Sequence, residues 1–409
     1  MFQRLFSPGK VSAPVQRRPR RVLFIATYPE EVASTRFRIT QFFPYLEKNG
    51  VSCTLSPLLS ANFCKEFYKK GALVRKVLKL FWFSLRRFWD VFRSLGYDIA
   101  FVQRESHLIG PPIVEWIISK IMRRPIVFDF DDPVFVSYVS PTYGKIGSYL
   151  KMPQKTGWVA KLSSHVIVCT HFSKVYAERY NLNVSVIPTV VDAEKFVPKA
   201  RQNPGELVIG WIGSFSSAYH LKTLTGVFEK LGEKYRFVLK IVGLGCKFHL
   251  KSPNIKVLNL EWEKEREVSD YQSLDIGLYP LFRDSWSEGK MGLKVIGYMA
   301  VGIPCVCSPV GDHVRFLRDG ENGMLASTEE EWIEKLSLLI EDGALRERLG
   351  RSARKTVEDW YCLQRQAPRL LEILKSVAAG RVPQAMAELS HPSEPVSQAR
   401  KNVGDEASR

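Results

Sequence analysis

The sequence predicts an α/β protein with two doubly wound parallel sheets. Short β-branched and aromatic runs alternate with helical patterns, and a polar break at residues 199–206 interrupts that alternation before it starts again. A length of 409 residues also exceeds what a single hydrophobic core usually supports. We therefore expect one domain at residues 21–200 and a second at residues 201–359.

The expected strands form two series. The first series lies at residues 21–27, 51–58, 98–104, 125–132, 165–170 and 184–189. The second series lies at residues 207–213, 237–243, 255–261, 275–281 and 303–310. Because helical patterns separate the strands, both sheets should be parallel, with ligands beyond the carboxyl ends of the strands. Two such domains that face each other would form a cleft.

The positive charge is concentrated in two segments. The formal net charge is +17, and residues 1–21 carry six basic groups and no acid. Residues 63–95 carry nine basic groups and two acids. This distribution indicates basic arms on an ordinary globular body, and it argues against a protein that coats nucleic acid.

The two ends of the chain differ in composition from the body. We interpret residues 1–20 as a basic arm and residues 381–409, which are rich in Pro, Ser, Ala and Gln, as a disordered tail. The arm lacks the apolar core of a signal peptide. No stretch reaches about 18 uncharged apolar residues, so we expect no membrane-spanning helix. Seven cysteines without a CxxC pair favour a reducing compartment.

Residues 287–311, SEGKMGLKVIGYMAVGIPCVCSPVG, place two lysines at the start of an expected helix. Gly292 should begin that helix, whose free amides and dipole favour an anion. Lys290 precedes it and Lys294 lies on its first turn, so both ammonium groups could reach the same anion. The loop GWIGSFSS at 210–217 follows the first strand of the second domain and should allow close approach of a phosphate. The alternative is that the glycines only allow close packing or cap the helix, and that the lysines are exposed to solvent.

Four stretches resemble, in the same order, motifs of glycosyltransferase family 4, whose members have the GT-B fold. They are VIPTVVDAEKF (186–196), GLKVIGYMAVGIPCV (292–306), SPVGDHVRFLRDGENGMLA (308–326) and WYCLQRQAPRLLEIL (360–374). The resemblance implies two Rossmann-like domains that face each other across a cleft, with a helix at 360–380 that crosses back to the first domain. It also implies metal-independent transfer of a sugar, with retained configuration, from a nucleotide-sugar held mainly by the second domain.

The sequence departs from the family pattern at two positions. The pattern has two glutamates eight residues apart, one near the sugar and one at the ribose, and the matching residues here are Gly289 and Gly297. Glu288 lies one residue out of register and could replace the first glutamate. These departures leave a second hypothesis open, in which a weak or inactive GT-B protein is the membrane-associated partner of an active transferase. The expected donor contacts are Gly213, Ser214, Glu288, Lys290, Gly292, Lys294 and Gly311.

The first domain carries candidate acceptor residues. It has no GxGxxG after its first strand, which disfavours a nicotinamide oxidoreductase. Ser34 or Thr35 is expected to cap a helix that begins near Arg36. Arg36 and Arg38 would then contact donor phosphate or an anionic acceptor, with a salt bridge at the helix start as the alternative.

Three aspartates follow the expected strand at 125–132. Asp129, Asp131 and Asp132 repel one another unless they have partners, and Arg104 is a candidate partner. One of these acids could orient or deprotonate an acceptor hydroxyl, although a purely structural Asp–Arg network is the alternative. The candidate catalytic residues are therefore Asp129, Asp131, Lys290 and Lys294, and the candidate acceptor or phosphate contacts are Arg36, Arg38, Arg104 and Asp132. A magnesium ion could bind these carboxylates, but neither a metal nor another cofactor is expected.

Residues 63–95 have the pattern of a membrane-interface helix. Apolar residues recur at steps of three and four from Val74 to Leu95, most lysines and arginines fall outside that stripe, and Trp82 and Trp89 lie at its edge. The alternative is that the stripe covers the first sheet. We expect a protein peripheral to the cytoplasmic face of the plasma membrane, with an anionic membrane surface and a lipid-linked or polysaccharide acceptor as partners, in cell-surface glycan synthesis.

Overall fold

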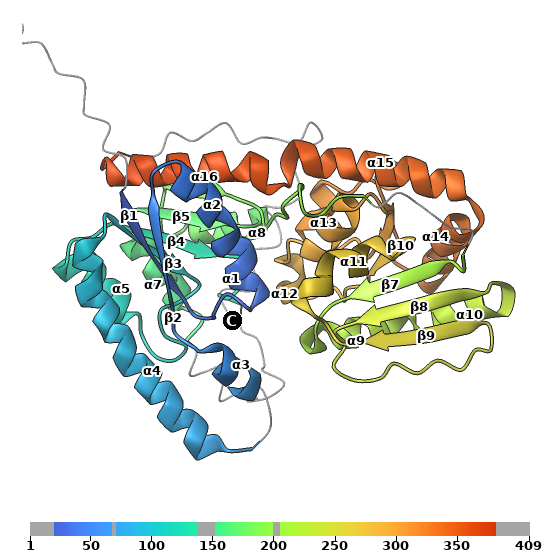
Figure 1. The fold of residues 1–409 in the computed structure, drawn as a ribbon, viewed down its shortest axis with the longest axis horizontal. Coiled ribbons are helices and arrows are strands. Elements are labelled where there is room, and N and C mark those ends of the chain that lie inside the picture. Colours follow the sequence, from blue (N-terminus) through green and yellow to red (C-terminus); the bar gives the residue numbers. More distant parts are fainter. Residues whose placement is uncertain (1–19, 68–70, 137–151, 199–204, 382–409) are drawn as a thin grey trace, which may run out of the picture.

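The computed structural model describes residues 20–67, 71–136, 152–198 and 205–381. Within these ranges the chain forms two α/β domains that lie side by side (Figure 1). The expected arm at 1–20 and tail at 381–409 lie almost entirely outside the described residues, so their character stays a prediction.

The first domain contains a six-stranded parallel sheet in the order β2-β1-β3-β4-β5-β6. Its strands are β1 (Arg21–Ala26), β2 (Ser52–Pro57), β3 (Ile99–Gln103), β4 (Ile126–Phe130), β5 (His165–Val168) and β6 (Val184–Val186). All six match predicted strands. The strand order reverses at β1, so the crevice beyond the carboxyl ends of β1 and β3 is the expected place for a ligand.

The second domain repeats this plan in the order β12-β11-β10-β7-β8-β9. Its strands are β7 (Val208–Ile212), β8 (Phe237–Val242), β9 (Ile255–Leu260), β10 (Ile276–Tyr279), β11 (Cys305–Cys307) and β12 (Met324–Leu325). Five of these were predicted. β12 was not, because a strand of two residues is too short to show a hydrophobic period. The strand order reverses between β7 and β10.

Helices flank both sheets. Those of the first domain are α1 (Ala33–Arg38), α2 (Phe43–Lys48), α3 (Ala61–Phe67), α4 (Leu73–Arg93), α5 (Ile113–Trp116), α7 (Lys155–Leu162) and α8 (His171–Ala177). Those of the second domain are α9 (Ala218–Leu221), α10 (Thr225–Lys234), α11 (Glu267–Gln272), α12 (Ser285–Glu288), α13 (Leu293–Ala300), α14 (Glu329–Glu341) and α15 (Gly343–Trp360). No helix in the described ranges has both the length and the apolar character needed to cross a bilayer.

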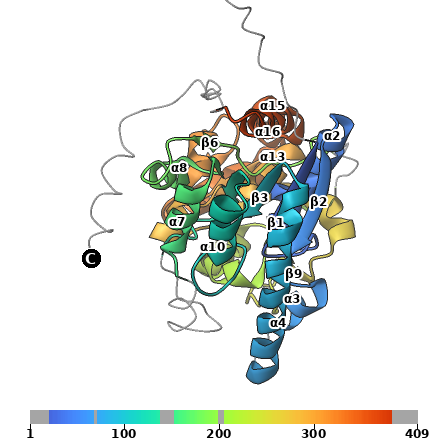
Figure 2. The same cartoon turned by 90° about the vertical axis from the view of Figure 1, so that its left-hand side faces the viewer.

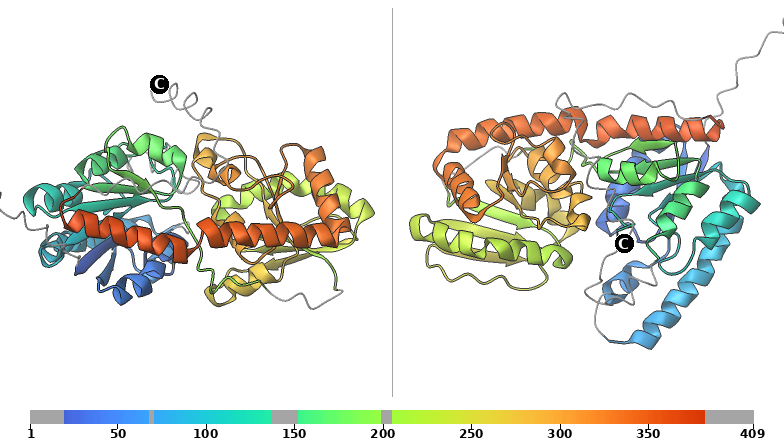
Figure 3. Two further views of the ribbon diagram at one scale, coloured as in Figure 1. Left: turned by 90° about the horizontal axis from the view of Figure 1, so that it is seen from above. Right: turned by 180° about the vertical axis from the view of Figure 1, so that it is seen from behind.

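The last helix, α16 (Leu363–Ala378), crosses back to the first domain, as predicted. α15 and α16 lie end to end along one side of both domains (Figure 1, Figure 3). Cys362, between them, forms a parallel bridge with Val191 of the interdomain segment. Leu370 and Leu374 of α16 then bury their side chains against Phe24 and its neighbours in the first core. This burial fixes one domain to the other through a continuous segment of chain.

The start of α1 differs from the prediction. The helix begins at Ala33, and its N-cap is Val32, without a side-chain cap. The predicted cap by Ser34 or Thr35 is therefore wrong. Thr35 lies inside the helix, and its buried hydroxyl donates a hydrogen bond of 2.9 Å to the carbonyl of Tyr28. That bond holds the loop after β1 against α1.

α4 presents its apolar face outward. The helix extends away from the sheet toward its N-terminal end (Figure 1, Figure 2), and Trp82 and Trp89 are each 67% exposed. The face that packs on the domain instead holds Arg87, which is 2% exposed and pairs with Asp90 at 2.7 Å. The apolar stripe does not cover the first sheet, because a charged pair occupies the buried side of the helix.

The polar face of α4 can be buried because each guanidinium nitrogen of Arg87 finds an acceptor. Its guanidinium donates to carbonyl oxygens near the carboxyl ends of three neighbouring strands, those of Ala26 at 2.7 Å, Ser56 at 2.8 Å and Ser106 at 3.2 Å. A buried charge is tolerated when it is paired and its donors are satisfied. This cluster therefore anchors α4 and leaves its apolar stripe free to face outward.

Candidate active site

Lys290 and Lys294 converge at the entrance to α13. Gly292 caps the helix in the left-handed conformation, with φ of 83°, which turns the chain between the two lysines. The Lys294 ammonium donates to Ser217 Oγ at 3.0 Å and lies 4.4 Å from the ring centre of Trp211. Across the described ranges, neither lysine is within ion-pair distance of a carboxylate. Two lysines thus meet at a helix N-terminus without an ion-pair partner among the described residues.

The pKa values of both lysines reflect this environment. Burial, together with the nearby charge of Lys290, lowers the pKa of Lys294 from 10.5 to about 7. Burial also lowers the pKa of Lys290, although the charges of Asp132 and Asp284 oppose the shift. Because desolvated ammonium groups without an ion-pair partner destabilise the folded state, a bound anion would relieve a cost already present in the free protein.

His220 is a third member of this site that the sequence did not reveal, since one histidine on a short helix carries no pattern. Its Nδ1 accepts a hydrogen bond of 3.1 Å from the backbone N–H of Phe282. Burial, with Lys290 and Lys294 adding to it, lowers the pKa of His220 to about 3, so the ring is neutral and carries its proton on Nε2. That N–H lies 3.5 Å from the Lys290 ammonium.

Two donors therefore face each other at this point. An N–H group and an ammonium cannot satisfy one another, and no acceptor between them comes from the described side chains. An oxygen of a bound phosphate would accept from both groups. The geometry of His220 and Lys290 thus favours an oxyanion as the missing partner.

Two further predicted donor residues border the same space. An added Cβ at Gly213 would lie 2.7 Å from the Lys294 ammonium, so the loop after β7 passes close to that charge. Gly311, with φ of 96°, approaches the carbonyl oxygen of Lys290 so closely that a Cβ would lie 2.8 Å from it. Ser214 caps the short turn Phe215–Ser217 through its backbone N–H, which donates to Ser217 Oγ at 3.4 Å. This short helical turn places the Ser217 hydroxyl next to the Lys294 ammonium.

The two departures from the family pattern have packing explanations. A Cβ at Gly297 would lie 2.6 Å from the Tyr271 ring, so that tyrosine fills the space that a longer side chain would need. A Cβ at Gly289 would lie 2.6 Å from Pro133 of the first domain. Glu288 lies at the rim, where it pairs with Arg283 at 2.9 Å. Both glycines therefore allow close contacts that a glutamate would prevent in this arrangement.

Arg38 and Asp129 form a buried pair in the first domain. Arg38 contacts both carboxylate oxygens of Asp129 and donates to the carbonyl of Ile187 at 2.7 Å. The two side chains are 2% and 1% exposed. This is the structural Asp–Arg network, and a ligand in the cleft cannot reach either group as they are packed here. The pair connects α1 and β4 to the end of β6.

Arg104 holds the other two aspartates. It adopts φ of 62°, an uncommon conformation for a residue with a side chain, and pairs with Asp131 at 2.6 Å and with Asp132. Burial opposes the charge of Asp131, but Arg104 lowers the pKa of that carboxyl below its ordinary value. Burial raises the pKa of Asp132, and Asp131 adds to the shift. Asp132 is 34% exposed and interacts with the charge of Lys290, so it is the acid of this group that lies toward the lysines of the second domain.

Several polar contacts hold the domains together around this space. Arg36 of α1 pairs with Glu267 of α11 at 2.7 Å, so the predicted phosphate contact instead forms a salt bridge between domains. The backbone N–H of His171 donates to Asp312 at 3.2 Å. The described residues include no group of three or more His, Cys, Asp or Glu side chains arranged to hold a metal ion.

Replacing Lys294 with methionine should stabilise the free protein. The pKa of Lys294 is lower in the folded protein than in the unfolded chain, so its charged form destabilises the folded state. This destabilisation is largest below pH 7 and decreases as the pH rises from about 7 toward 10.5. We expect Lys294→Met to raise stability by about 1–4 kcal/mol near neutral pH, with a smaller gain in alkali, measured by thermal unfolding at several pH values. Lys222→Met, at an exposed lysine nearby, is the control and should change stability by less than about 0.5 kcal/mol. A destabilised Lys294→Met protein would contradict this account of the site.

Comparisons with known proteins agree with the fold. Residues 206–342, which contain both lysines and His220, match the family model described as glycosyl transferases group 1. Among solved structures, sucrose-phosphate synthase from Thermosynechococcus elongatus has a TM-score of 0.64 at 14% identity, over 88% of this chain and 100% of that one.

The Anabaena protein HepE, in complex with UDP and glucose, has a TM-score of 0.61 at 14% identity, over 88% of this chain and 100% of that one. The lipopolysaccharide outer core galactosyltransferase WaaB has a TM-score of 0.55 at 12% identity, over 87% and 98%. No curated protein matches the sequence. The fold is GT-B, and together with the family match it supports a glycosyltransferase enzyme.

Proposed function

We propose that this protein transfers a sugar, with retained configuration and without a metal, from a nucleotide-sugar to a lipid-linked or polysaccharide acceptor. The observation that carries the proposal is that three donors, Lys290, Lys294 and His220, meet at the start of α13 with no carboxylate at ion-pair distance among the described residues. We place the enzyme on the cytoplasmic face of the plasma membrane, in a pathway of cell-surface glycan synthesis. Its seven cysteines are all free, which is consistent with a reducing compartment.

The site suits the departure of a nucleoside diphosphate. As the bond between the sugar and the diphosphate breaks, negative charge grows on the leaving oxygen, and donors already aimed at that oxygen stabilise the transition state. Lys290 lies 3.5 Å from His220 Nε2, and Lys294 adds a second cation beside the α13 N-terminus. HepE was solved with UDP and with UDP-glucose, so UDP-sugars are the first donors to test here.

The acceptor hydroxyl is proposed to contact Asp132. Of the three aspartates, it has the most exposed side chain at 34%, and its pKa is raised by burial. A carboxylate of raised pKa is a better proton acceptor than Asp131, which Arg104 keeps ionised. The second candidate, a partner protein with little activity, rests on the absence of side chains at Gly289 and Gly297.

Diphosphate binding should take up a proton. Lys294 has a pKa of about 7 in the free protein, and a bound diphosphate would raise it. The affinity for UDP, GDP or ADP should therefore be constant below that pH and fall by up to about tenfold per pH unit above it. Calorimetry in buffers with different ionisation enthalpies would measure the uptake.

The variants for this experiment are Lys290→Met with Lys294→Met, which should abolish binding, and Lys222→Met, which should not affect it. If the double variant binds a diphosphate as tightly as the unaltered protein does, the proposed donor site is wrong.

Asp132→Asn should impair catalysis more than folding. We expect turnover to fall by about 10²–10⁴-fold, measured as nucleotide release from UDP-, GDP- and ADP-sugars with a membrane extract as acceptor, while thermal stability and diphosphate affinity stay near those of the unaltered protein. Asp129→Asn is the contrasting variant and should mainly destabilise the first domain, because it breaks the buried pair with Arg38. Binding of a diphosphate without turnover on any donor would favour the inactive partner.

Membrane attachment is proposed to occur through α4. Its outward face is apolar, the same helix carries exposed cations such as Arg75 and Arg86, and each cation near an anionic surface contributes about 1 kcal/mol. The protein should float with vesicles that contain phosphatidylglycerol, and flotation should weaken with added salt. Arg75→Glu with Arg86→Glu should reduce flotation, whereas Arg348→Glu with Arg351→Glu on α15 should not. An unaltered protein that fails to float would reject α4 as a membrane contact.

A further inference from the structure

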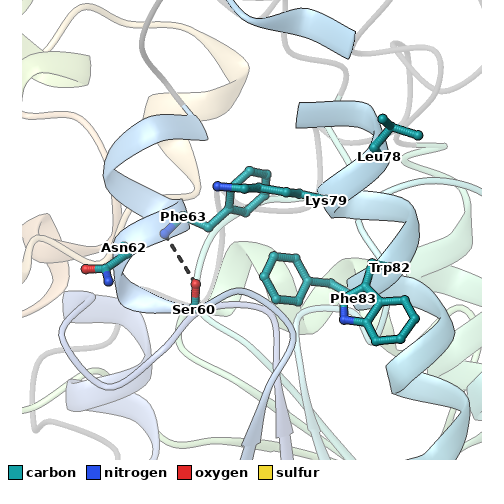
Figure 4. A pocket seen from close by; sticks show the side chains of 7 residues that line it. All are labelled: Ser60, Asn62, Phe63, Leu78, Lys79, Trp82 and Phe83. Atoms are coloured by element: carbon teal, nitrogen blue, oxygen red, sulfur yellow. Dashed lines mark hydrogen bonds between the residues drawn. The ribbon is translucent and has the colours of Figure 1, made fainter. Parts of the chain in front are cut away.

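An open groove of about 480 Å³ lies between α3 and α4 (Figure 4). Its lining side chains are Ser60, Asn62, Phe63, Leu78, Lys79, Trp82 and Phe83. Phe63 is almost fully buried, whereas Leu78 and Trp82 on the α4 side are largely exposed. The walls are thus mainly apolar, although the groove is open to the outside.

The polar groups of the groove are few. Ser60 accepts a hydrogen bond of 3.3 Å from the backbone N–H of Phe63 at the start of α3. The Lys79 ammonium lies 5.4 Å from the Phe63 ring centre and pairs with Glu66 at 2.9 Å. An apolar channel along a helix of net positive charge fits a molecule that has a hydrocarbon chain and an anionic group.

The groove is connected to the acceptor side of the cleft. Phe63 and Phe83 belong to an apolar cluster that also contains Tyr28, in the loop after β1. The Arg104 guanidinium lies 6.0 Å from the Tyr28 ring centre, and the same guanidinium pairs with Asp131 and Asp132. Tyr28 therefore links the packing behind the groove to the Arg104 pair. A chain held in the groove would keep its head group on this side of the first domain.

We propose that the groove binds one hydrocarbon chain of an anionic membrane lipid and so presents the head group of that lipid, the acceptor, to Arg104 and Asp132. This inference rests on the proposed transferase function and commits it to a lipid acceptor. Charge complementarity favours an anionic lipid over a second copy of this chain. If the α4 helices of two copies packed against each other, their positive charges would repel. The outward apolar face of α4 would lie in the same bilayer from which the lipid enters.

Trp82 and Trp89 provide a matched pair for the test. Both lie on α4, both are 67% exposed, and only Trp82 lines the groove. The probe is phosphatidylglycerol with a diazirine in one acyl chain, carried in vesicles of phosphatidylcholine and phosphatidylglycerol. After irradiation, mass spectrometry of peptides maps the crosslinks.

We expect crosslinks on the groove residues of both α3 and α4. Trp82→Glu should lower the crosslink yield per vesicle-bound protein about tenfold, which corresponds to about 1.4 kcal/mol. Trp89→Glu should weaken flotation as much as Trp82→Glu does, but it should leave the crosslink yield per vesicle-bound protein unchanged. Leu78→Glu is a second groove variant and should behave like Trp82→Glu. Because these side chains are largely exposed, the variants should fold normally, and thermal unfolding would check this.

Three results would overturn the proposal. The first is an equal loss of crosslinking in the Trp82 and Trp89 variants, and the second is crosslinks spread along the outer face of α4 without any on α3. The third is a dimer in solution with no lipid crosslinks, which would assign the groove to a second copy. Diphosphate affinity measured on the same samples separates these results from a failure of the donor site, since that site lies in the other domain.

Discussion

The proposed chemistry depends on two lysines, partly buried at the start of α13, that have no carboxylate within ion-pair distance among the described residues. Lys294 packs against the Trp211 ring, and Lys290 faces an N–H of His220, although each ammonium would be better solvated in water. The backbone enforces this arrangement, because the left-handed turn at Gly292 brings both lysines to one side.

The two domains supply opposite charges to the same cleft. The second domain contributes the lysines, and the first contributes Asp131 and Asp132, which Arg104 holds in place. The domains are kept together by the Arg36–Glu267 pair and by the close approach of Gly289 to Pro133. A donor phosphate held from one side and an acceptor hydroxyl held from the other would then react in a space that both domains enclose.

On the outer surface of the first domain, a charged pair is buried and apolar side chains face outward. α4 is anchored by the buried Arg87–Asp90 pair, whose donors are satisfied by strand carbonyls, while its apolar residues face outward. An apolar face of this size gains free energy when something covers it. The proposed anionic lipid partner rests on the cations of the same helix and on the groove beside α3, both in the domain that carries the candidate acceptor residues.

The sequence by itself determined the two parallel sheets, eleven of the twelve strands in the described ranges, and the meeting of Lys290 and Lys294 at one helix end. These features are encoded in neighbouring residues, through periods of two and of three to four along the chain. It also indicated that α4 has an apolar face, but not which way that face points. Periodicity describes a helix, and only the packing of Arg87 fixes its orientation.

Tertiary structure decided which groups became partners. Arg38 pairs with Asp129 across 91 residues, and His220 meets Lys290 across 70. Tyr271 fills the space beside Gly297, and Pro133 of the other domain fills the space beside Gly289. None of these contacts has a local sequence pattern, because each depends on how the strands are ordered and how the domains meet. The sequence therefore supplied the charges and helices of the site, and the fold decided which charges were neutralised and which were left for a ligand.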